Sequence, residues 1–176
     1  MAEIKTVHYG SDVKTIGVLA DTHIPTRGRF IPPQLFRIFN GVQLILHAGD
    51  LVDEQVLIEL RALAPVEAVA GNMDPPDLQA SLGKLKLVKV GGVVIALVHG
   101  DLAGHRVSFE RLSELFKPAK PRVIIFGHLH ETVNEMYDNI LFFNPGSAMD
   151  PRRSPKPSCG RLQINGFDVS SEIFYL

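Results

Sequence analysis

Residues 15–23 read TIGVLADTH, an apolar run followed at once by a carboxylate and an imidazole. The run over residues 15–20 is β-branched and apolar, which predicts a buried strand. Asp21 and His23 follow it two positions apart, so in an extended chain both side chains point the same way and could bind one metal ion. Taken alone, the aspartate is more simply explained as the cap of a turn, and the rest of the chain has to distinguish the two interpretations.

Four further strand-like runs end in polar signatures of the same kind. They are Gly49-Asp50 after residues 42–47, Gly71-Asn72 after 66–70, His99-Gly100 after 93–98, and Gly127-His128-Leu129-His130 after 123–126. With Asp21 and His23 they supply two aspartates, one asparagine and four histidines, a set of oxygen and nitrogen donors that suits two neighbouring divalent cations. Each signature alone has a structural explanation, as a turn or a core histidine. Their recurrence at five strand ends favours a binuclear metal site.

The elements alternate in the first half of the chain and become all-β in the second. Strands are expected over residues 15–20, 42–47, 66–70, 85–90, 93–98, 123–126, 131–137, 140–143, 161–164 and 170–175, and helices over 32–41, 53–63 and 106–117. Pro75 and Pro76 predict a loop, and residues 1–14 a loose N-terminal extension of a single domain that spans 1–176. Sequential strand–helix–strand units require a parallel sheet covered by helices, with ligands at its carboxyl edge, which is where the signatures fall.

The composition limits the function classes. At 176 residues, with 45% hydrophobic and 21% charged residues, the chain can bury a proper core as one globular domain. Its net charge of −1 offers no extended basic surface, so neither nucleic acid nor an anionic membrane is expected as a partner. Cys159, the only cysteine, excludes an internal disulfide and a thiolate zinc cluster. No apolar run has the length of a membrane span or the character of a signal peptide, and a cytoplasmic protein is expected.

The five signatures, in this order, resemble the calcineurin-like metallophosphoesterase family. The resemblance runs from about Ile16 to the Asn144-Pro145-Gly146-Ser147 segment, which covers most of the chain. That segment and the compact length resemble the small bacterial and archaeal phosphodiesterase branch of the family. The resemblance implies an α/β fold, a four-layer α/β/β/α sandwich with the metal ions at its rim.

The resemblance also assigns seven metal ligands, motif by motif. It places Asp21, His23 and His130 on one ion, Asn72, His99 and His128 on the other, and Asp50 as the bridge between them. The family implies two divalent ions, with manganese expected and nickel, iron or zinc as alternatives. In the implied mechanism a hydroxide that bridges the two ions, held beside Asp50, attacks the phosphorus in line, and no protein nucleophile is needed.

Other residues are expected to support these ligands. Arg152 is a candidate phosphate contact because it follows the turn at 144–147, and Asn72 is a second candidate; the simpler interpretation of the arginine is a solvated loop charge. His47, Asp74 and Asp101 are expected next to the ligands without binding metal themselves.

Two positions depart from the family pattern: Met73, and Asp101, which follows His99-Gly100 where relatives in the small branch often have a histidine. Many members have Gly-Asn-His, and that histidine is thought to protonate the leaving group, whereas this chain has Met73 there. A missing acid argues against efficient monoester hydrolysis, so a small phosphodiester with an activated leaving group is the expected substrate.

Two alternatives remain open, a phosphomonoesterase and a non-enzymatic scaffold. The Thr22-His23-Ile24-Pro25 stretch is similar to the phosphoesterase-fold subunit of the retromer coat, which binds partner proteins. The full ligand set favours retained catalysis over the scaffold. Exposed edges of the β-rich half could also pair two copies in a homodimer.

Overall fold

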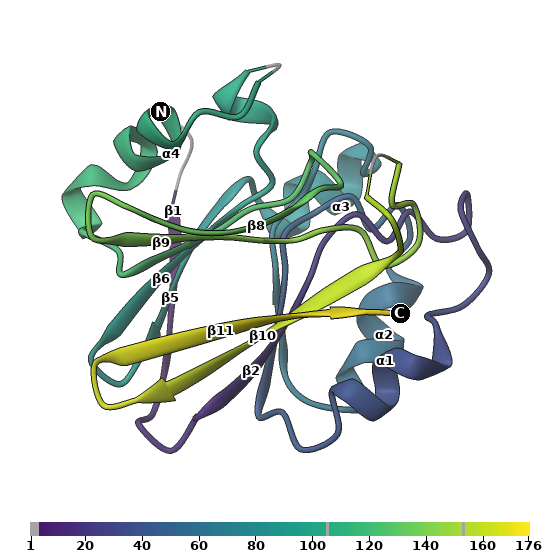
Figure 1. Cartoon of the computed structure of the whole chain (residues 1–176). Helices are drawn as coiled ribbons and strands as arrows, with labels where there is room; N and C mark the ends of the chain where they lie inside the picture. The colour runs from purple at the N-terminus through teal and green to yellow at the C-terminus, as the bar shows by residue number, and fades with distance from the viewer. Residues whose placement is uncertain (1–3, 105, 153) are drawn as a thin grey trace.

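Two stacked β-sheets lie between helices in the computed structural model, which describes residues 4–104, 106–152 and 154–176 (Figure 1). Helices α1 and α2 pack on the outer face of one sheet and α4 on the outer face of the other. The expected four-layer α/β/β/α sandwich is therefore confirmed. Within the described part of the chain, no helix combines the length and apolar character needed to cross a membrane.

The first sheet holds the parallel strands that the sequence predicted. Its order is β11-β10-β2-β3-β4, where β2 (Thr15–Leu19), β3 (Leu44–His47) and β4 (Val66–Ala68) are parallel, and β10 (Ser158–Asn165) and β11 (Asp168–Tyr175) are antiparallel additions. Helices α1 (Pro33–Ile38) and α2 (Gln55–Arg61) connect the parallel strands. The apolar stripes of these helices cover β2 and β3, because Leu35 and Leu60 pack with Leu19 and Ile45.

The second sheet is mixed. Its order is β1-β5-β6-β7-β9-β8, with β1 (Ile4–Tyr9), β5 (Leu85–Val90), β6 (Val93–Val98), β7 (Val123–Ile125), β8 (Thr132–Tyr137) and β9 (Ile140–Pro145). The Gly91-Gly92 turn joins β5 and β6 as an antiparallel hairpin, as expected. Helix α4 (Phe109–Phe116), capped by Ser108, turns Leu112 and Phe116 onto this sheet. Short helices η1 (Asp101–Ala103) and η2 (Lys117–Ala119) flank it.

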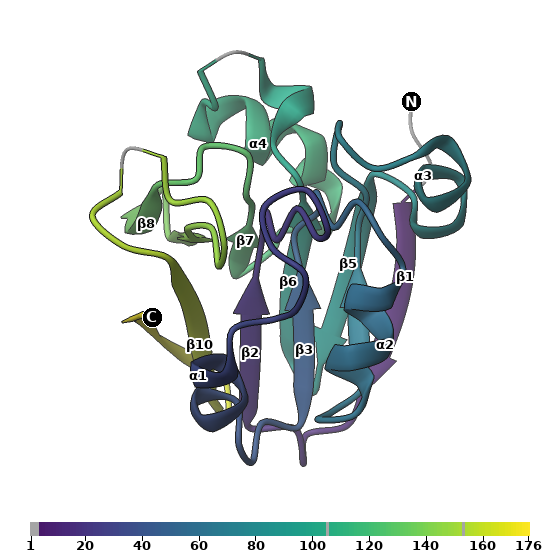
Figure 2. The ribbon, with the colours of Figure 1, turned by 90° about the vertical axis from the view of Figure 1, so that its right-hand side faces the viewer.

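The core between the sheets is apolar and fully buried. Val18 and Leu46 from one sheet meet Ile95, Ile125 and Phe143 from the other. This layer fixes the two sheets face to face, so that the ends of β2, β3, β4, β6 and β7 meet at one edge of the sandwich. Figure 2 shows the loops that follow β2 and β3 gathered at that upper edge.

Two expectations about local structure are wrong. Residues 4–9, expected within a loose extension, form strand β1, which pairs in parallel with β5 from Ile4–Leu85 to Tyr9–Val90; residues 1–3 lie outside the described residues. Pro76 was expected in a loop but opens helix α3 (Pro76–Leu82). Proline is favourable at the first helical position because its missing N–H has no helical partner there, so this proline starts a helix instead of breaking one.

Candidate metal centre

Five of the predicted ligands converge in a buried cluster at the loop edge. Asp21 and His23 come from the loop after β2, Asp50 from the loop after β3, His99 from the end of β6, and His130 from the loop after β7. Their exposed fractions lie between 0% and 4%. Charged and imidazole side chains are rarely buried together unless they pair with each other or bind a metal ion.

The first half of the cluster surrounds one carboxylate oxygen of Asp21. Asp21 Oδ1 lies 3.2 Å from His130 Nε2 and 3.8 Å from His23 Nε2. The two imidazole Nε2 atoms are 3.3 Å apart. Three ligand atoms therefore lie within reach of one ion, in the set expected from the sequence.

The second half of the cluster shares Asp21 and adds Asp50 and His99. His99 Nε2 lies 3.2 Å from Asp50 Oδ2 and 4.0 Å from Asp21 Oδ1, and these three residues could hold a second ion. His23 Nε2 is 3.6 Å from Asp50 Oδ2, so the two halves are continuous. His128, less buried than the others, places Nδ1 3.3 Å from His99 Nε2 at the edge of this half.

Backbone carbonyls fix the orientation of two of the imidazoles. His99 Nδ1–H donates to the carbonyl of Ala48 at 2.8 Å, and His130 Nδ1–H donates to the carbonyl of Asp150 at 2.5 Å. Because a carbonyl only accepts, Nδ1 carries the proton in each ring and Nε2 faces the cluster. Metal-binding histidines are usually held by such an outer hydrogen bond, which orients the ligand nitrogen toward the ion.

An unsatisfied oxygen tests whether the cluster fits a cation. Asp21 Oδ1 is buried without a hydrogen-bond partner among the described residues, although Oδ2 accepts the His128 N–H at 3.0 Å. A buried carboxylate oxygen without a donor is costly. The atoms around it are imidazole nitrogens, and in His99 and His130 the bond from Nδ1 to a backbone carbonyl leaves the lone pair of Nε2 pointing inward. A divalent cation would satisfy this oxygen and those nitrogens at once, so the residues present fit a metal site.

The pKa values of the cluster follow from burial and mutual attraction. Burial alone would raise the pKa of Asp21, but the attraction of the neighbouring His130, His23 and His99 imidazoles in their charged form outweighs it and holds that pKa well below its usual range. Burial lowers the pKa of His99, yet the carboxylates of Asp50 and Asp21 reverse this and raise it to about 9. The carboxylates thus attract positive charge into the cluster, and a cation can take the place of the proton on His99.

The backbone at these ligands is not extended, which corrects the reasoning from spacing. Asp21 has a φ of 53°, His23 of 46° and Asp50 of 57°, and His128 and His130 have values of 70° and 58°. Left-handed conformations of residues other than glycine are uncommon and collect at functional sites. His128 and His130 accordingly turn to different neighbours, His99 and Asp21.

Two of the residues expected to support the ligands contact the backbone of the ligand loops. Asp74 accepts the N–H groups of Asp50 at 3.1 Å, Val52 at 2.6 Å and Gly71 at 2.8 Å. It thereby holds the loop after β4 against the loop after β3. Buried His47, whose pKa burial lowers to about 3, accepts the Gly49 N–H at 3.2 Å through Nδ1.

Asp101 lies farther out and is linked to the cluster by a residue that sequence reasoning missed. Lys84 Nζ donates to the Gly71 carbonyl at 2.8 Å and lies 3.3 Å from Asp101 Oδ2. This lysine joins the loop after β4 to the loop after β6. Nothing in the sequence around Lys84 predicts that it joins these two loops, because a lysine directly before a strand carries no distinguishing signal.

The Asn144-Pro145-Gly146-Ser147 segment also supports the cluster, although its contacts could not be read from the sequence. Asn144 Nδ2 donates to the Gly127 carbonyl at 2.9 Å, and Ser147 Oγ donates to the Asp21 carbonyl at 2.7 Å. These two bonds join the end of β9 to the ligand loops. Its turn-forming composition and its part in the family resemblance were the signals in the sequence that suggested a role.

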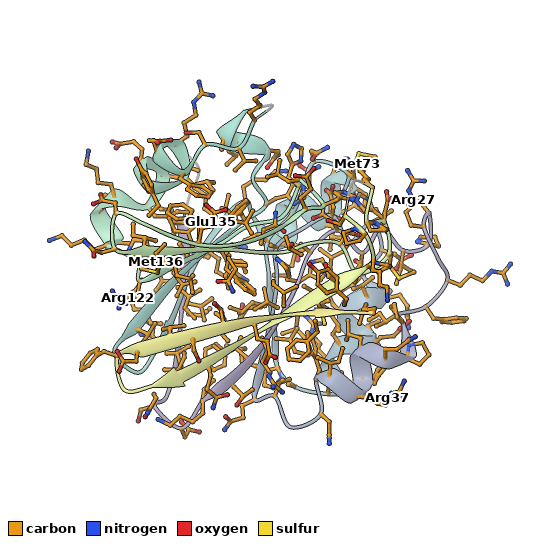
Figure 3. The ribbon with its side chains drawn as sticks, in the orientation of Figure 1. Arg27, Arg37, Met73, Arg122, Glu135 and Met136 are labelled. Carbon is orange, nitrogen blue, oxygen red and sulfur yellow. The ribbon has the colours of Figure 1, made fainter. Side chains whose placement is uncertain are left out.

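Two predicted site residues, Asn72 and Arg152, lie at the surface beside the cluster, as does Met73. Asn72 is exposed, and its side chain makes no hydrogen bond to any described residue. The loop that carries Asn72 contacts the ligand Asp50 through the Met73 N–H, but the Asn72 amide itself does not reach the other ligands. Met73 is 57% exposed, and its N–H donates to Asp50 Oδ1 at 2.8 Å. Arg152 contacts Asp150 and is also exposed. Figure 3 shows Met73 and Arg27 at the same end of the molecule, away from Arg122 and Met136.

Comparisons with known proteins agree with this geometry. The family model of the calcineurin-like phosphoesterase superfamily domain matches residues 15–166. The chain is 38% identical to a probable metallophosphoesterase of Methanothermobacter thermautotrophicus over 90% of both chains. It is 32% identical to a phosphodiesterase of Methanocaldococcus jannaschii over 76% of this chain and 83% of that protein. Among solved structures, Vps29 of Entamoeba histolytica in complex with zinc is similar, with a TM-score of 0.75, 26% identity and coverage of 92% and 98%.

Proposed function

The chain belongs to the calcineurin-like phosphoesterase superfamily, and from this premise we propose that it is a phosphodiesterase with a binuclear metal centre. The observation that carries the proposal is the buried oxygen Asp21 Oδ1, which has no hydrogen-bond donor in the described part of the chain and lies among three imidazole nitrogens. A purely structural cluster would pair that oxygen with a donor.

Seven residues would hold two divalent ions, with manganese as the proposed metal. One ion would take Asp21, His23 and His130, the other Asn72, His99 and His128, and Asp50 would be shared. In this assignment the exposed amide of Asn72 would have to turn inward. The complex of Entamoeba histolytica Vps29 with zinc supports a divalent ion on this fold. Ions bound here would supply Lewis acidity, lowering the pKa of a coordinated water and offsetting charge on phosphoryl oxygens.

The protein's own groups orient the reactants. The Ala48 and Asp150 carbonyls keep His99 and His130 in the tautomer that turns Nε2 inward. Asp74 and the Met73 N–H fix the backbone and carboxylate of Asp50, so its position does not depend on the substrate. Substrate would approach from the exposed side, past Asn72 and Met73. Water serves as the nucleophile in this scheme, because hydrolysis adds it across one P–O bond of the diester.

The side chain of Met73 favours diesters over monoesters. It projects at the rim, more than half exposed, where it offers no proton to a leaving group. Phosphodiesters with good leaving groups need less protonation than alkyl monoesters do. Rates on a mono- and a diester of the same phenol would separate the two activities, and faster monoester hydrolysis would favour a phosphomonoesterase.

A non-enzymatic scaffold is the second candidate, favoured by the structural likeness to Vps29. The two functions differ in metal stoichiometry and turnover. A phosphodiesterase should bind about two equivalents of manganese and hydrolyse bis(p-nitrophenyl) phosphate. A scaffold should bind a partner protein tightly with no turnover in the presence of metal.

Replacing the proposed bridging ligand tests the assignment. Asp50→Ala should release or weaken both ions and reduce turnover by orders of magnitude while the fold survives, because one shared carboxylate is lost. Asp168→Ala, at an exposed aspartate of β11, is the matched control and should leave metal binding and turnover unchanged. Full activity of Asp50→Ala would contradict the assignment, and metal-loaded wild type inert toward aryl and nucleotide diesters would contradict the function.

A further inference from the structure

Two arginines meet at one carboxylate oxygen beside the metal centre. Arg27 Nε lies 3.1 Å and Arg152 Nε 3.6 Å from Asp150 Oδ2. The arginine side chains are 57% and 51% exposed, whereas the aspartate side chain is only 17% exposed. The arginines come from loops 125 positions apart in the chain, so only the tertiary fold brings them together.

Asp150 is bound firmly to the metal-site loops. Its carbonyl accepts from His130 Nδ1, its N–H donates to Ser147 Oγ at 2.8 Å, and its Oδ2 lies 3.9 Å from His130 Nδ1. The Arg27 N–H donates to the His23 carbonyl at 2.8 Å. One imidazole ring, that of His130, therefore separates the arginine pair from Asp21 Oδ1 in the candidate metal centre.

The two guanidinium groups keep most of their hydrogen-bonding capacity. Each approaches Asp150 through Nε, and neither contact is a hydrogen bond: Arg152 at 3.6 Å is too distant, and Arg27 at 3.1 Å is poorly aligned. Two positive charges face a single carboxylate, so the group has a net charge of about +1. The paired, planar Nη donors of arginine match the oxygens of a phosphate group in geometry and charge.

We propose that Arg27 and Arg152, held by Asp150, form a subsite for a second phosphate of the substrate, next to the diester that is cleaved. The inference rests on the proposed function and narrows its substrate class to phosphodiesters that carry a further terminal phosphate, as a 5′-phosphorylated dinucleotide does. An ordinary solvated ion pair would need neither two arginines on one oxygen nor an aspartate bound to a ligand histidine.

Kinetics on two matched substrates test the subsite. Thymidylyl-thymidine with and without a 5′-phosphate share the same scissile diester, so their kcat/KM ratio measures recognition of the additional phosphate. With manganese-loaded wild type we expect a preference of roughly 10-fold for the phosphorylated dinucleotide, the size of one good charge-assisted contact. Arg27→Gln and Arg152→Gln should each reduce this ratio, and the double variant should bring it to about 1.

The controls separate recognition from catalysis. The variants should lower kcat/KM far more for the phosphorylated dinucleotide than for the unphosphorylated one, because neither arginine is a proposed metal ligand. Arg37→Gln, at an exposed arginine of α1 on a different part of the surface (Figure 3), should keep the full preference. Arg27→Lys should retain part of it, since charge remains while the paired donors are lost.

A binding measurement avoids the metal ions and turnover altogether. Inorganic phosphate titrated into the metal-free protein should shift the NMR signals of the Arg27 and Arg152 Nε–H groups but not that of Arg37. Equal kcat/KM for the two dinucleotides together with unshifted arginine signals would overturn the subsite and leave the phosphodiesterase standing. Shifted signals without hydrolysis of any diester would support the subsite and overturn the proposed activity.

Discussion

Gly71→Ala should damage the metal centre without removing a ligand. A Cβ at residue 71 would lie 2.0 Å from Asp50 Oδ1, 2.6 Å from Asp50 N and 2.7 Å from Asp50 Cγ. Because real Cβ atoms essentially never approach other atoms closer than 3.0 Å, the carboxylate oxygen must move by at least about 1 Å. Gly71 does not have a positive φ, so alanine meets no backbone strain there and the effect is steric alone.

Asp50 has little freedom to absorb this movement. Its N–H is bound to Asp74 Oδ2 at 3.1 Å and its Oδ1 accepts the Met73 N–H at 2.8 Å, so a shift breaks one of these bonds or carries the loop with it. Overpacking of this kind costs about 1–3 kcal/mol, which corresponds to a fall in Tm of roughly 5 °C for a chain of this length. Displacing a catalytic group by about 1 Å should lower turnover about 100-fold.

Metal titration, thermal unfolding and diester hydrolysis would be measured on the same preparations. Metal affinity should fall by roughly 10-fold or more in Gly71→Ala, as when the support of a ligand is lost. Gly166→Ala is the control, because residue 166 has a φ of 63° with no atom within 4 Å of an added Cβ. It should lose about 1 kcal/mol of stability and keep both metal affinity and turnover. Gly71→Ala with wild-type affinity and rate would refute the reasoning.

Four further outcomes follow from the structure. His130→Ala should reduce turnover of an aryl diester by roughly 100-fold or more, whereas His8→Ala, at an exposed histidine of β1, should have no effect. Equal rates for the two variants would exclude His130 as a ligand. Cys159 is fully buried, and burial raises its pKa to about 12. A thiol reagent at pH 8 should therefore label it only after unfolding in urea, and rapid labelling of the native protein would contradict the packing. Because the pKa of Cys159 is raised in the folded state, the unfolded thiol ionises above about pH 9 and the folded one does not. The free energy of unfolding, measured with urea, should therefore fall as the pH rises above about 9. Lys84→Met should weaken metal binding, because the positively charged lysine joins two ligand loops, and Lys84→Arg should restore part of the affinity. Calorimetric titration with manganese measures that affinity, and an unchanged value in Lys84→Met would contradict the role of the lysine.

Sequence reasoning located the ligands because polar residues directly after apolar runs carry a local signal. Asp21, Asp50, His99 and His130 each follow such a run, and parallel strands place their carboxyl ends at one edge whatever the details of packing. The helices on the outer faces were likewise predicted by their apolar stripes. The signal fails where one residue suits two roles, as at Pro76, which can break a helix or begin one.

Non-local pairing and backbone detail carry no such local signal. Strand β1 pairs with β5, about eighty residues away, and nothing within residues 4–9 specifies that partner. The spacing of Asp21 and His23 suggested an extended chain, but tertiary contacts hold both in the left-handed region. The amino-acid order therefore defines which groups are available and at which strand ends. Close packing of the two sheets and the loops above them defines which groups touch, including the Asp150 arginine pair, because those contacts join segments that are remote along the chain.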